Sequence, residues 1–330
     1  MFKKLKESLN FPENNLFDEF MLVSIIIVNW NRLKDTLECL KSLENIKTGF
    51  NIELVIIDNA STDGSPKKIR EYFNNHLLGK KDFSFNLIEN RINLGFCGGN
   101  NIGIGYALKN NADFILLLNN DTLVDGNFLL NLTGVFGKYP DAGIVSPKIY
   151  FRGGYEFHKS RYKKTDLGKV IWYAGGDIDW KNVYGSNHGV DQVDHGQFDK
   201  ITETDFATGA CMIIRRQVIE DIGMLDEKYF MYFEDDDLSV RAKKAGWKVL
   251  YAPKAHIWHK VSQSSGIGGP LNDYFITRNR LLFGMRYASL RTRFALYRES
   301  LKLLSKGRKW QKKGVIDFYF RKFGRGSWSD

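Results

Sequence analysis

The stretch Asp113-Phe-Ile-Leu-Leu-Leu-Asn-Asn-Asp121 organises the rest of this 330-residue chain. Its bulky apolar residues end abruptly in two amides and a carboxylate, a pattern typical of a buried strand in a parallel sheet. Ligands of open α/β sheets bind beyond the carboxyl ends of the strands, where Asn119, Asn120 and Asp121 would stand. A carboxylate there can hold a hard divalent cation and leave other positions for phosphate oxygens. Taken alone, the three residues are equally compatible with a polar turn.

Two earlier apolar runs also end in polar residues. Residues 23–28 end at Asn29-Trp30-Asn31, and residues 53–57 end at Asp58-Asn59. Leucines at helical spacing predict a helix over 33–43, and Ser65 as N-cap with Pro66 at the first helical position predicts another. This order predicts an α/β fold in which each crossover leads to a parallel neighbour.

The remaining elements are predicted from the same signals. A Gly/Asn-rich loop over 93–101 precedes a helix from about residue 102, and residues 256–259 are placed in a loop after the last core strand. Residues 149–200 show little periodicity and are expected to form functional loops, whereas residues 271–328 are expected to be helical and outside the sheet. Other strands are expected at 85–88, 143–145, 207–214 and 247–251, and other helices near 128–136, 216–222 and 238–245, with Gly246 as C-cap.

The charge of the chain is uneven. The formal net charge is +10, and from Arg291 to the end there are twelve Lys and Arg against three Asp and Glu. A basic segment attracts polyanions, which include nucleic acids, anionic membranes and phosphorylated substrates. No recognised nucleic-acid-binding motif accompanies it, so we expect no nucleic-acid partner.

Cysteine usage and hydropathy indicate a compartment. Cys39, Cys97 and Cys211 are isolated and form no C-x-x-C, which suits small core residues in a reducing compartment. Residues 1–20 lack the apolar region of a signal peptide, and no run reaches the length of a membrane span. We expect a cytoplasmic protein that binds peripherally at the inner face of the cell membrane, if it binds a membrane at all.

Polar residues follow three of the predicted strands, at Asn29 and Asn31, at Asp58 and Asn59, and at Asn120 and Asp121. A nucleotide-binding half-sheet needs this pattern, because a carboxylate at a strand end can accept from a base imide or a ribose hydroxyl. Neither Gly-x-Gly-x-x-Gly after a strand nor Gly-x-x-x-x-Gly-Lys-Ser/Thr occurs, so two common phosphate cradles are excluded. A metal ion would then have to neutralise bound phosphates.

Seven motifs follow one another along the chain: Val28-Asn-Trp-Asn31, Asp58-Asn-Ala-Ser-Thr-Asp63, Asn93-Leu-Gly-Phe96, Leu117-Leu-Asn-Asn-Asp-Thr122, Thr208-Gly-Ala-Cys211, Phe233-Glu-Asp-Asp-Asp-Leu238 and Trp258-His259. Together they resemble family-2 glycosyltransferases of the GT-A fold, especially the rhamnosyltransferase-like branch, over roughly residues 22–285. Each motif is weak alone, and the ordered series is specific. The resemblance implies an α/β fold with a mostly parallel central sheet flanked by helices.

The resemblance also implies a division of the chain. A leader would occupy residues 1–21, a catalytic domain residues 22–285 and a basic helical extension residues 286–330. Within the catalytic domain, residues 22–125 would form the nucleotide-binding half and residues 126–285 the acceptor-binding half.

Residue roles follow from the matching positions. Asp58 would contact the nucleobase and Asn120 would lie near the ribose, while Asp121 closes the family's D-x-D motif and would bind Mg²⁺ or Mn²⁺. Asn119 takes the first position of that motif, where a neutral amide need not touch the metal. His259 matches a histidine that completes the metal shell in some relatives, and its alternative is a hydrogen-bonded loop histidine. The other expected substrate-binding positions are Val28, Asn29, Asn31, Asn59, Asn93, Glu234, Arg278 and Asn279.

Asp235 matches the catalytic base of the family. Acids at a helix N-terminus are stabilising, which is the simpler explanation for Asp236 and Asp237, but clustered acids also raise one another's pKa, as a general base requires. The resemblance implies direct displacement with inversion, in which Asp235 takes the acceptor proton and the metal stabilises the leaving diphosphate. Arg278 and Asn279 would contact acceptor or diphosphate, or form a salt bridge on a helix surface.

Donor and acceptor are expectations from the branch alone. It suggests dTDP-rhamnose, with UDP-linked hexoses and galactofuranose still open, and a lipid-linked or cell-surface glycan as acceptor. A sugar-phosphate nucleotidyltransferase is the alternative enzyme, but the chain lacks a Gly-rich phosphate loop near the N-terminus. The basic, aromatic C-terminal segment predicts either a surface for anionic lipids or a solvated cap on the catalytic domain.

Overall fold

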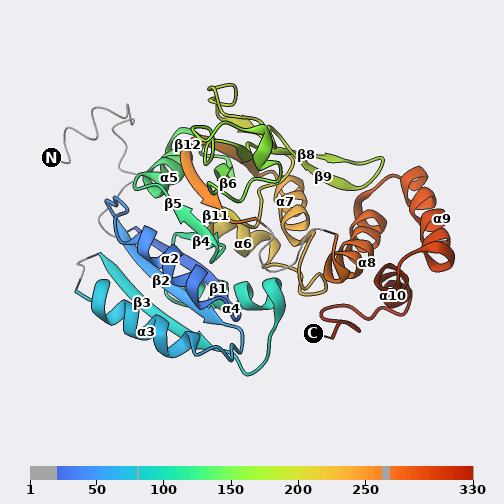
Figure 1. Ribbon diagram of the computed structural model, residues 1–330, viewed down its shortest axis with the longest axis horizontal. Helices are drawn as coiled ribbons and strands as arrows, with labels where there is room; N and C mark the ends of the chain where they lie inside the picture. Colours follow the sequence, from blue (N-terminus) through green and yellow to red (C-terminus); the bar gives the residue numbers. More distant parts are fainter. Residues whose placement is uncertain (1–20, 80–81, 262–267, 330) are drawn as a thin grey trace.

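The computed structural model describes residues 21–79, 82–261 and 268–329 (Figure 1). The leader expected over 1–21 therefore lies, except for Met21, outside the described residues. The strands are β1 (Leu22–Asn29), β2 (Asn51–Asp58), β3 (Phe83–Glu89), β4 (Phe114–Leu118), β5 (Thr122–Val124), β6 (Ala142–Phe151), β7 (Ile171–Tyr173), β8 (Gly176–Asp179), β9 (Tyr184–Asn187), β10 (Thr202–Glu203), β11 (Cys211–Arg215) and β12 (Lys248–His259).

Ten of these strands form one sheet, with the order β10-β12-β6-β11-β4-β1-β2-β3, β5 beside β12 and β7 beside β6. The strands β3, β2, β1 and β4 pair in parallel, as do β6 and β12. Because β11 is antiparallel to both β4 and β6, those two point the same way, and the central sheet is mostly parallel. The α/β prediction is confirmed, and a strand was expected over residues 207–214, but the antiparallel direction of β11 was not predicted.

The helices are α2 (Leu33–Leu43), α3 (Ser65–His76), α4 (Gly95–Lys109), α5 (Phe128–Lys138), α6 (Arg216–Ile222), α7 (Glu234–Lys244), α8 (Pro270–Tyr287), α9 (Leu290–Lys306) and α10 (Lys309–Tyr319), with a 3-10 turn at Lys159–Arg161. Helix α4 packs on β1, β2 and β4, and α5 and α7 both pack on β6 and β12. Because β1 pairs in parallel with both β2 and β4, the polar ends of these three strands lie at one edge of the sheet.

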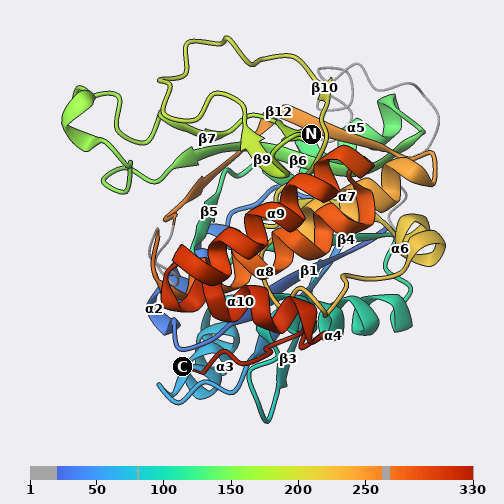
Figure 2. The ribbon, with the colours of Figure 1, turned by 90° about the vertical axis from the view of Figure 1, so that its right-hand side faces the viewer.

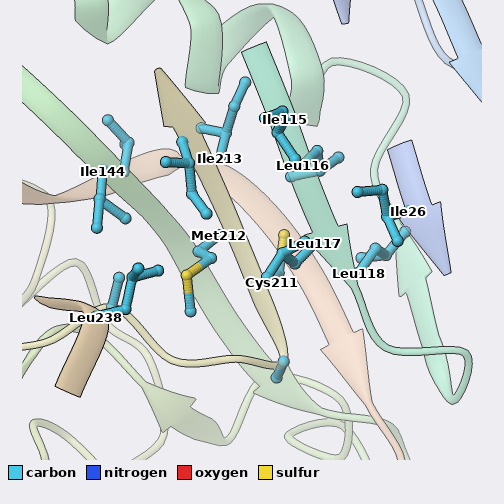
Figure 3. Packing of buried hydrophobic residues seen from close by; sticks show 14 of the residues in the cluster. Ile26, Ile115, Leu116, Leu117, Leu118, Ile144, Cys211, Met212, Ile213 and Leu238 are labelled. Atoms are coloured by element: carbon cyan, nitrogen blue, oxygen red, sulfur yellow. The ribbon is translucent and has the colours of Figure 1, made fainter. Parts of the chain in front are cut away.

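The core is apolar on both faces of the central strands. All residues of β4 are buried, and in Figure 3 its Leu116 and Leu117 lie beside Met212 and Ile213 of β11, with Ile144 of β6 beyond them. Burying such a side chain is worth about 1.5–3 kcal/mol. The three cysteines are buried free thiols in this core.

Helix α4 begins at Gly95, not near residue 102 as predicted. Its glycines lower helix propensity, but they let the helix approach the sheet. A Cβ on Gly103 would come within 2.5 Å of Ile26, and one on Gly99 within 2.9 Å of Val28. Tertiary packing therefore overrides the local signal.

Three other boundary predictions are wrong. Helix α3 already includes Ser65, so the N-cap position falls on Gly64. Residues 207–210 form a loop that ends in a turn before β11. Residues 256–259 belong to β12, which continues past a register shift between Ala252 and His256. A proline at position 253 makes such an irregularity look like the end of a strand.

The last three helices lie outside the sheet, as predicted. Figure 2, which views the molecule from the right-hand side of Figure 1, shows α8, α9 and α10 beside one another. The boundary expected at residue 285 falls inside α8. Helix α10 packs along α8, and Tyr274 of α8 donates a hydrogen bond to Asp317 of α10. Within the described residues, no helix is both long and apolar enough to cross a membrane.

Candidate active site

Strand pairing brings Asp121 and His259 together. The short strand β5 begins directly after Asp121 and pairs antiparallel with the end of β12, so that Thr122 faces His259. The amide of Lys260 donates to the carbonyl oxygen of Asp121 at 3.1 Å. Nε2 of His259 then lies 3.0 Å from Oδ1 of Asp121, with both side chains mostly buried.

The chemistry of this pair fits a divalent metal ion. Oδ1 of Asp121 lies close to Nε2 of His259 but accepts no hydrogen bond from it, and Nδ1 of His259 is buried without a hydrogen-bond partner. Such buried polar atoms are costly unless something binds them. Burial acts to raise the pKa of Asp121, but His259 and Lys260 outweigh it, so the pKa lies below its usual range. In the described parts of the chain, no group of three or more such ligands is found, so diphosphate and water would complete the shell.

Lys260, next to His259, is a buried cation paired with two carboxylates. Its ammonium is buried and lies 2.6 Å from Oδ1 of Asp35 and 3.0 Å from Oε2 of Glu38. These two carboxylates raise the pKa of Lys260 against the opposing effect of burial. A buried charge needs such pairing, and no sequence motif pointed to this residue.

Hydrogen bonds link the polar ends of β1, β2 and β4. Nδ2 of Asn29 donates to Oδ2 of Asp58 at 2.7 Å and to Oγ of Ser61 at 3.0 Å. Thr36 donates to Oδ1 of Asn29 at 2.7 Å and accepts from Nδ2 of Asn120 at 2.9 Å. Expected donor-site residues on three strand ends thus form one network.

Asp58 is an organiser of this network as well as a candidate contact. It is 1% exposed, and its Oδ1 accepts from the amide of Ser61 at 2.8 Å. Asn31 is exposed beside it and accepts from the amide of Thr62 at 2.7 Å. The turn after β2 is therefore folded back onto the end of β1.

The end of β2 is also tied to the start of α4. Nδ2 of Asn59 donates to the carbonyl oxygen of Gly95 at 2.9 Å, and Asn90 donates to Oδ1 of Asn59 at 2.8 Å. Oδ1 of Asn93 accepts from the amide of Gly95 at 2.8 Å. Val28 lines the same place, against Gly99.

Glu234, Asp235, Asp236 and Asp237 form the first turn of α7. Glu234, Asp236 and Asp237 are buried, whereas Asp235 is partly exposed. Oδ2 of Asp235 accepts from the amide of Gly209 at 2.9 Å. Of the four acids, Asp235 is thus the one that a substrate can reach.

Burial raises the pKa of three of these acids. It does so for Asp235, although the amides of Gly209 and Asp236 act against it. It raises the pKa of Glu234 and Asp236 well above the usual range, with help from their charged neighbours. Oε2 of Glu234 and Oδ1 of Asp236 have no hydrogen-bond partner.

Asp237 has a structural environment. It accepts from Tyr229 at 3.1 Å and Tyr287 at 2.8 Å, and it pairs with Arg241 at 2.7 Å and Arg286 at 3.2 Å. This agrees with the simpler explanation for an acid at a helix N-terminus.

Arg278 and Asn279 are not placed as predicted. Both are 0% exposed, so the prediction of a salt bridge on a helix surface is wrong. A direct contact with substrate is not available to them in this structure. Their side chains donate to backbone carbonyl oxygens around Tyr229 instead.

Four residues of the site were not predicted from the sequence: Thr36, Ser61, Gly209 and Lys260. Ser61 lies within the motif Asp58–Asp63 and Gly209 within Thr208–Cys211. Their motifs were recognised, but no role was predicted for these two residues. Thr36 and Lys260 reach the site through tertiary contacts, which single-sequence patterns do not show.

Comparison with solved structures identifies the fold. The fold is similar to GalNAc-T7 with UDP, GalNAc and Mn²⁺ (TM-score 0.57, 17% identity, 94% of this chain and 57% of that one). It is also similar to the mannosyltransferase PcManGT from Pyrobaculum calidifontis in complex with GDP-Man and Mn²⁺ (TM-score 0.52, 16% identity, 100% and 83%). The fold is that of the GT-A glycosyltransferases.

A family profile described as Glycosyl transferase family 2 matches residues 24–223. The chain belongs to this family and is a glycosyltransferase, which confirms the resemblance seen in the sequence.

Relatives place it more closely. The low-salt glycan biosynthesis hexosyltransferase Agl10 of Haloferax volcanii is 29% identical over 67% of this chain and 62% of its own length. An N-acetylglucosaminyl-diphospho-decaprenol L-rhamnosyltransferase of Mycobacterium tuberculosis is 24% identical over 67% and 71%. The dTDP-rhamnosyl transferase RfbF of Shigella flexneri is 22% identical over 70% of each chain. The names of the second and third relatives support the rhamnosyltransferase-like branch.

Proposed function

We propose that this glycosyltransferase moves a sugar, with rhamnose favoured, from a nucleoside-diphosphate sugar to a hydroxyl of a lipid-linked or cell-surface glycan. One observation carries the proposal. The amide of Asn119 donates to the carbonyl oxygen of Ala210 at 3.0 Å, while the amide of Gly209 binds Asp235 at 2.9 Å. Two adjacent residues thus join the strand end before Asp121 to the reachable acid of α7.

The reaction is a direct displacement at the anomeric carbon. Asp235 accepts the proton of the acceptor hydroxyl as that oxygen forms its bond to the anomeric carbon. The bond to the nucleoside diphosphate breaks on the opposite face, so the centre is inverted. A Mg²⁺ or Mn²⁺ ion held by Asp121 and His259 would stabilise the negative charge of the leaving diphosphate. The raised pKa of Asp235 makes its carboxylate a stronger base.

The donor is proposed from the linked strand ends and the names of relatives. Asn29, Asp58 and Asn120 form one network at the edge where nucleotides bind in open sheets, and exposed Asn31 and Thr62 flank it. A dTDP-linked rhamnose is the first choice, because two of the relatives are rhamnosyltransferases by name. UDP-linked hexoses and galactofuranose are the next donors to test.

A membrane surface is proposed as a further partner. Leu290, Phe294, Tyr297 and Leu301 lie on one face of α9 and are 81%, 63%, 44% and 47% exposed. Arg291, Arg298 and Lys302 are exposed alongside them. An apolar face flanked by cations suits an interface with anionic head groups. Docking there would bring the site to a lipid-linked acceptor.

A panel of nucleotide sugars tests the activity. The wild-type chain in Mn²⁺ is offered dTDP-rhamnose, UDP-hexoses, UDP-galactofuranose and GDP-mannose, and free nucleoside diphosphate is measured. Release from one donor, absent in Asp235→Asn, is the expected result. Release of pyrophosphate from a nucleoside triphosphate, without nucleoside diphosphate from any sugar donor, would instead indicate a nucleotidyltransferase.

A further inference from the structure

The segment before the acids has a backbone that aromatic residues rarely adopt. Phe230, Tyr232 and Phe233 have φ angles of 66°, 68° and 71°, in the left-handed region that is costly for residues with a Cβ. Such a backbone persists only where its surroundings hold it. Residues 228–233 are called the acid loop below, because the acids of α7 follow it directly.

Asn279 of α8 holds the acid loop from one side. Its Nδ2 lies within hydrogen-bond distance of three loop carbonyl oxygens, those of Tyr229 at 2.9 Å, Met231 at 2.7 Å and Tyr232 at 2.9 Å. Its Oδ1 accepts from Nε of Arg278 at 3.0 Å. A fully buried amide with all these partners fixes the loop carbonyls in one arrangement.

Arg278 joins the acid loop to the C-terminal tail, residues 321–328. Its Nη2 donates to the carbonyl oxygens of Lys228 at 3.1 Å and Tyr229 at 2.9 Å, and its Nη1 donates to that of Gly324 at 2.6 Å. The amide of Gly324 returns to the carbonyl oxygen of Lys228 at 2.9 Å. A planar guanidinium reaches several carbonyls at fixed angles, which a lysine ammonium does not.

The tail is itself held to α10. Asp317 accepts from the amide of Ser327 at 2.8 Å and from its hydroxyl at 3.0 Å. The carboxylate of Asp317 also accepts from Tyr274 of α8. The end of the described chain is therefore built into the structure that surrounds Arg278.

The other side of the acid loop faces the donor half. The amide of Cys97, in the first turn of α4, donates to the carbonyl oxygen of Phe230 at 3.1 Å. A Cβ on Gly95 would come within 2.5 Å of the Phe230 ring, so the two segments are in close contact. The acid loop thus lies between the donor edge and the residues that hold it.

We infer that Arg278 and Asn279 are positioning residues, which together with the tail fix the acid loop and, through it, Asp235 relative to the donor edge. The inference rests on the proposed function, in which Asp235 is the base. It gives the C-terminal residues a part in the reaction that is separate from any docking of α9 to a membrane. Misplacing a reacting group by about 1 Å can cost about a hundredfold in rate.

Two glycines with positive φ offer a matched test that leaves Arg278 itself unchanged. Gly326 has φ of 60°, and a Cβ there would overlap the Tyr274 hydroxyl and come within 2.9 Å of Nη1 of Arg278. Gly246, after the C-terminal end of α7, has φ of 93°, and a Cβ there would meet no atom within 4 Å. Gly326→Ala therefore displaces the tail from Arg278, while Gly246→Ala carries only the backbone strain.

The full chain carrying each substitution is assayed for transfer, donor binding and hydrogen exchange. We expect Gly326→Ala to lower kcat by roughly ten- to a hundredfold, to leave the donor KM within about twofold, and to move the acid limb of the kcat–pH profile. Amides of residues 229–237 should exchange faster. Gly246→Ala should resemble the wild type, and Arg278→Lys should change kcat in the same direction as Gly326→Ala.

Equal kcat values for the two glycine variants would overturn the inference, as would a parallel change in kcat and donor KM. In either case the contacts of Arg278 would contribute stability alone. Hydrogen exchange reports on the link between tail and acid loop even when no nucleotide sugar is consumed. A wild-type chain that consumes no donor counts against the proposed function, whereas unchanged exchange in Gly326→Ala counts against the positioning role.

Discussion

Nε2 of His259 lies 3.0 Å from Oδ1 of Asp121. The two side chains meet because His259, at the end of β12, pairs with Thr122 of β5, the residue directly after Asp121. The pair offers an oxygen and a nitrogen ligand side by side, and neither Oδ1 of Asp121 nor Nδ1 of His259 takes part in a hydrogen bond. These unpartnered atoms support the proposed site for Mg²⁺ or Mn²⁺.

Asp121→Ala should nearly abolish transfer, and it should weaken donor binding in Mn²⁺, because the substitution removes the charged ligand. Isothermal titration of Mn²⁺ with nucleoside diphosphate present measures the loss without relying on turnover. His259→Ala should weaken the same binding.

Asp125→Asn is the matched control, since Asp125 directly follows β5 whereas Asp121 directly precedes it, and the carboxylate of Asp125 accepts from the amide of Asn127 at 2.8 Å. Full activity of the wild type in EDTA, or of Asp121→Ala in Mn²⁺, would show that the metal assignment is wrong.

Asp235→Asn keeps the shape of the side chain and an acceptor for the Gly209 amide, but it cannot take a proton. We expect kcat to fall by at least about a hundredfold, the lower range for general-base catalysis, with donor affinity little changed. Steady-state kinetics with the best donor of the panel provide the measurement. A variant within a few-fold of the wild type would move the role to Glu234 or Asp236.

The pH dependence of the wild type follows from the same residue. The base must be deprotonated, and burial raises the pKa of Asp235, so kcat should fall with decreasing pH through a pKa above the ordinary aspartate range of about 3.9. A kcat–pH profile at saturating donor shows this limb. An acid limb at or below the ordinary value would contradict the raised pKa.

Asp236→Asn should stabilise the protein at neutral and alkaline pH. Burial and the charges of Asp235 and Asp237 raise the pKa of Asp236 well above its usual value, so the folded chain binds this proton more tightly than the unfolded chain. Wild-type stability is then lost as pH rises through the folded pKa. The Tm of Asp236→Asn should exceed that of the wild type by roughly 2–4 °C per kcal/mol gained at pH 8.

The Tm gap between Asp236→Asn and the wild type should close near pH 4, because both side chains are then neutral. Glu220→Gln, on the exposed side of α6, is the control and should show no such trend. A Tm gap that is independent of pH would place the effect in packing instead of protonation.

The polar strand ends were predictable because they combine local signals. Asn29, Asp58 and Asp121 each terminate an apolar run, and parallel strands bring such ends to one edge. The pairing of Asp121 with His259 was not predictable from the pattern alone, because Pro253 and the register shift in β12 disguise a strand as a loop. Only the family resemblance pointed to that histidine.

Arg278 and Asn279 show the opposite limit. The sequence places them in an expected helical region, but it does not say what they face. Their partners are backbone carbonyls in the acid loop and the tail, and carbonyl groups carry no sequence signal. Burial at 0% exposure is a property of how three helices pack.

The exposed face of α9 gives the last prediction. Removing everything after Leu290 would also remove the tail and α10, which contact Arg278 and Tyr274, so point substitutions are the sharper test. Phe294→Ser with Leu301→Ser removes two exposed apolar groups of that face, and each cation beside them can add about 1 kcal/mol of attraction to anionic lipid. The wild type should co-sediment with vesicles of anionic phospholipid at low salt and be released at high salt, because surface charges are screened. The double variant should bind at least about tenfold more weakly, since a buried large apolar side chain is worth about 1.5–3 kcal/mol.

Leu78→Ser, which changes a leucine that is 68% exposed beyond α3, is the control and should bind as the wild type does. If the double variant and Leu78→Ser sediment alike, or if the wild type does not bind these vesicles, α9 is a solvated cap and the membrane proposal is wrong.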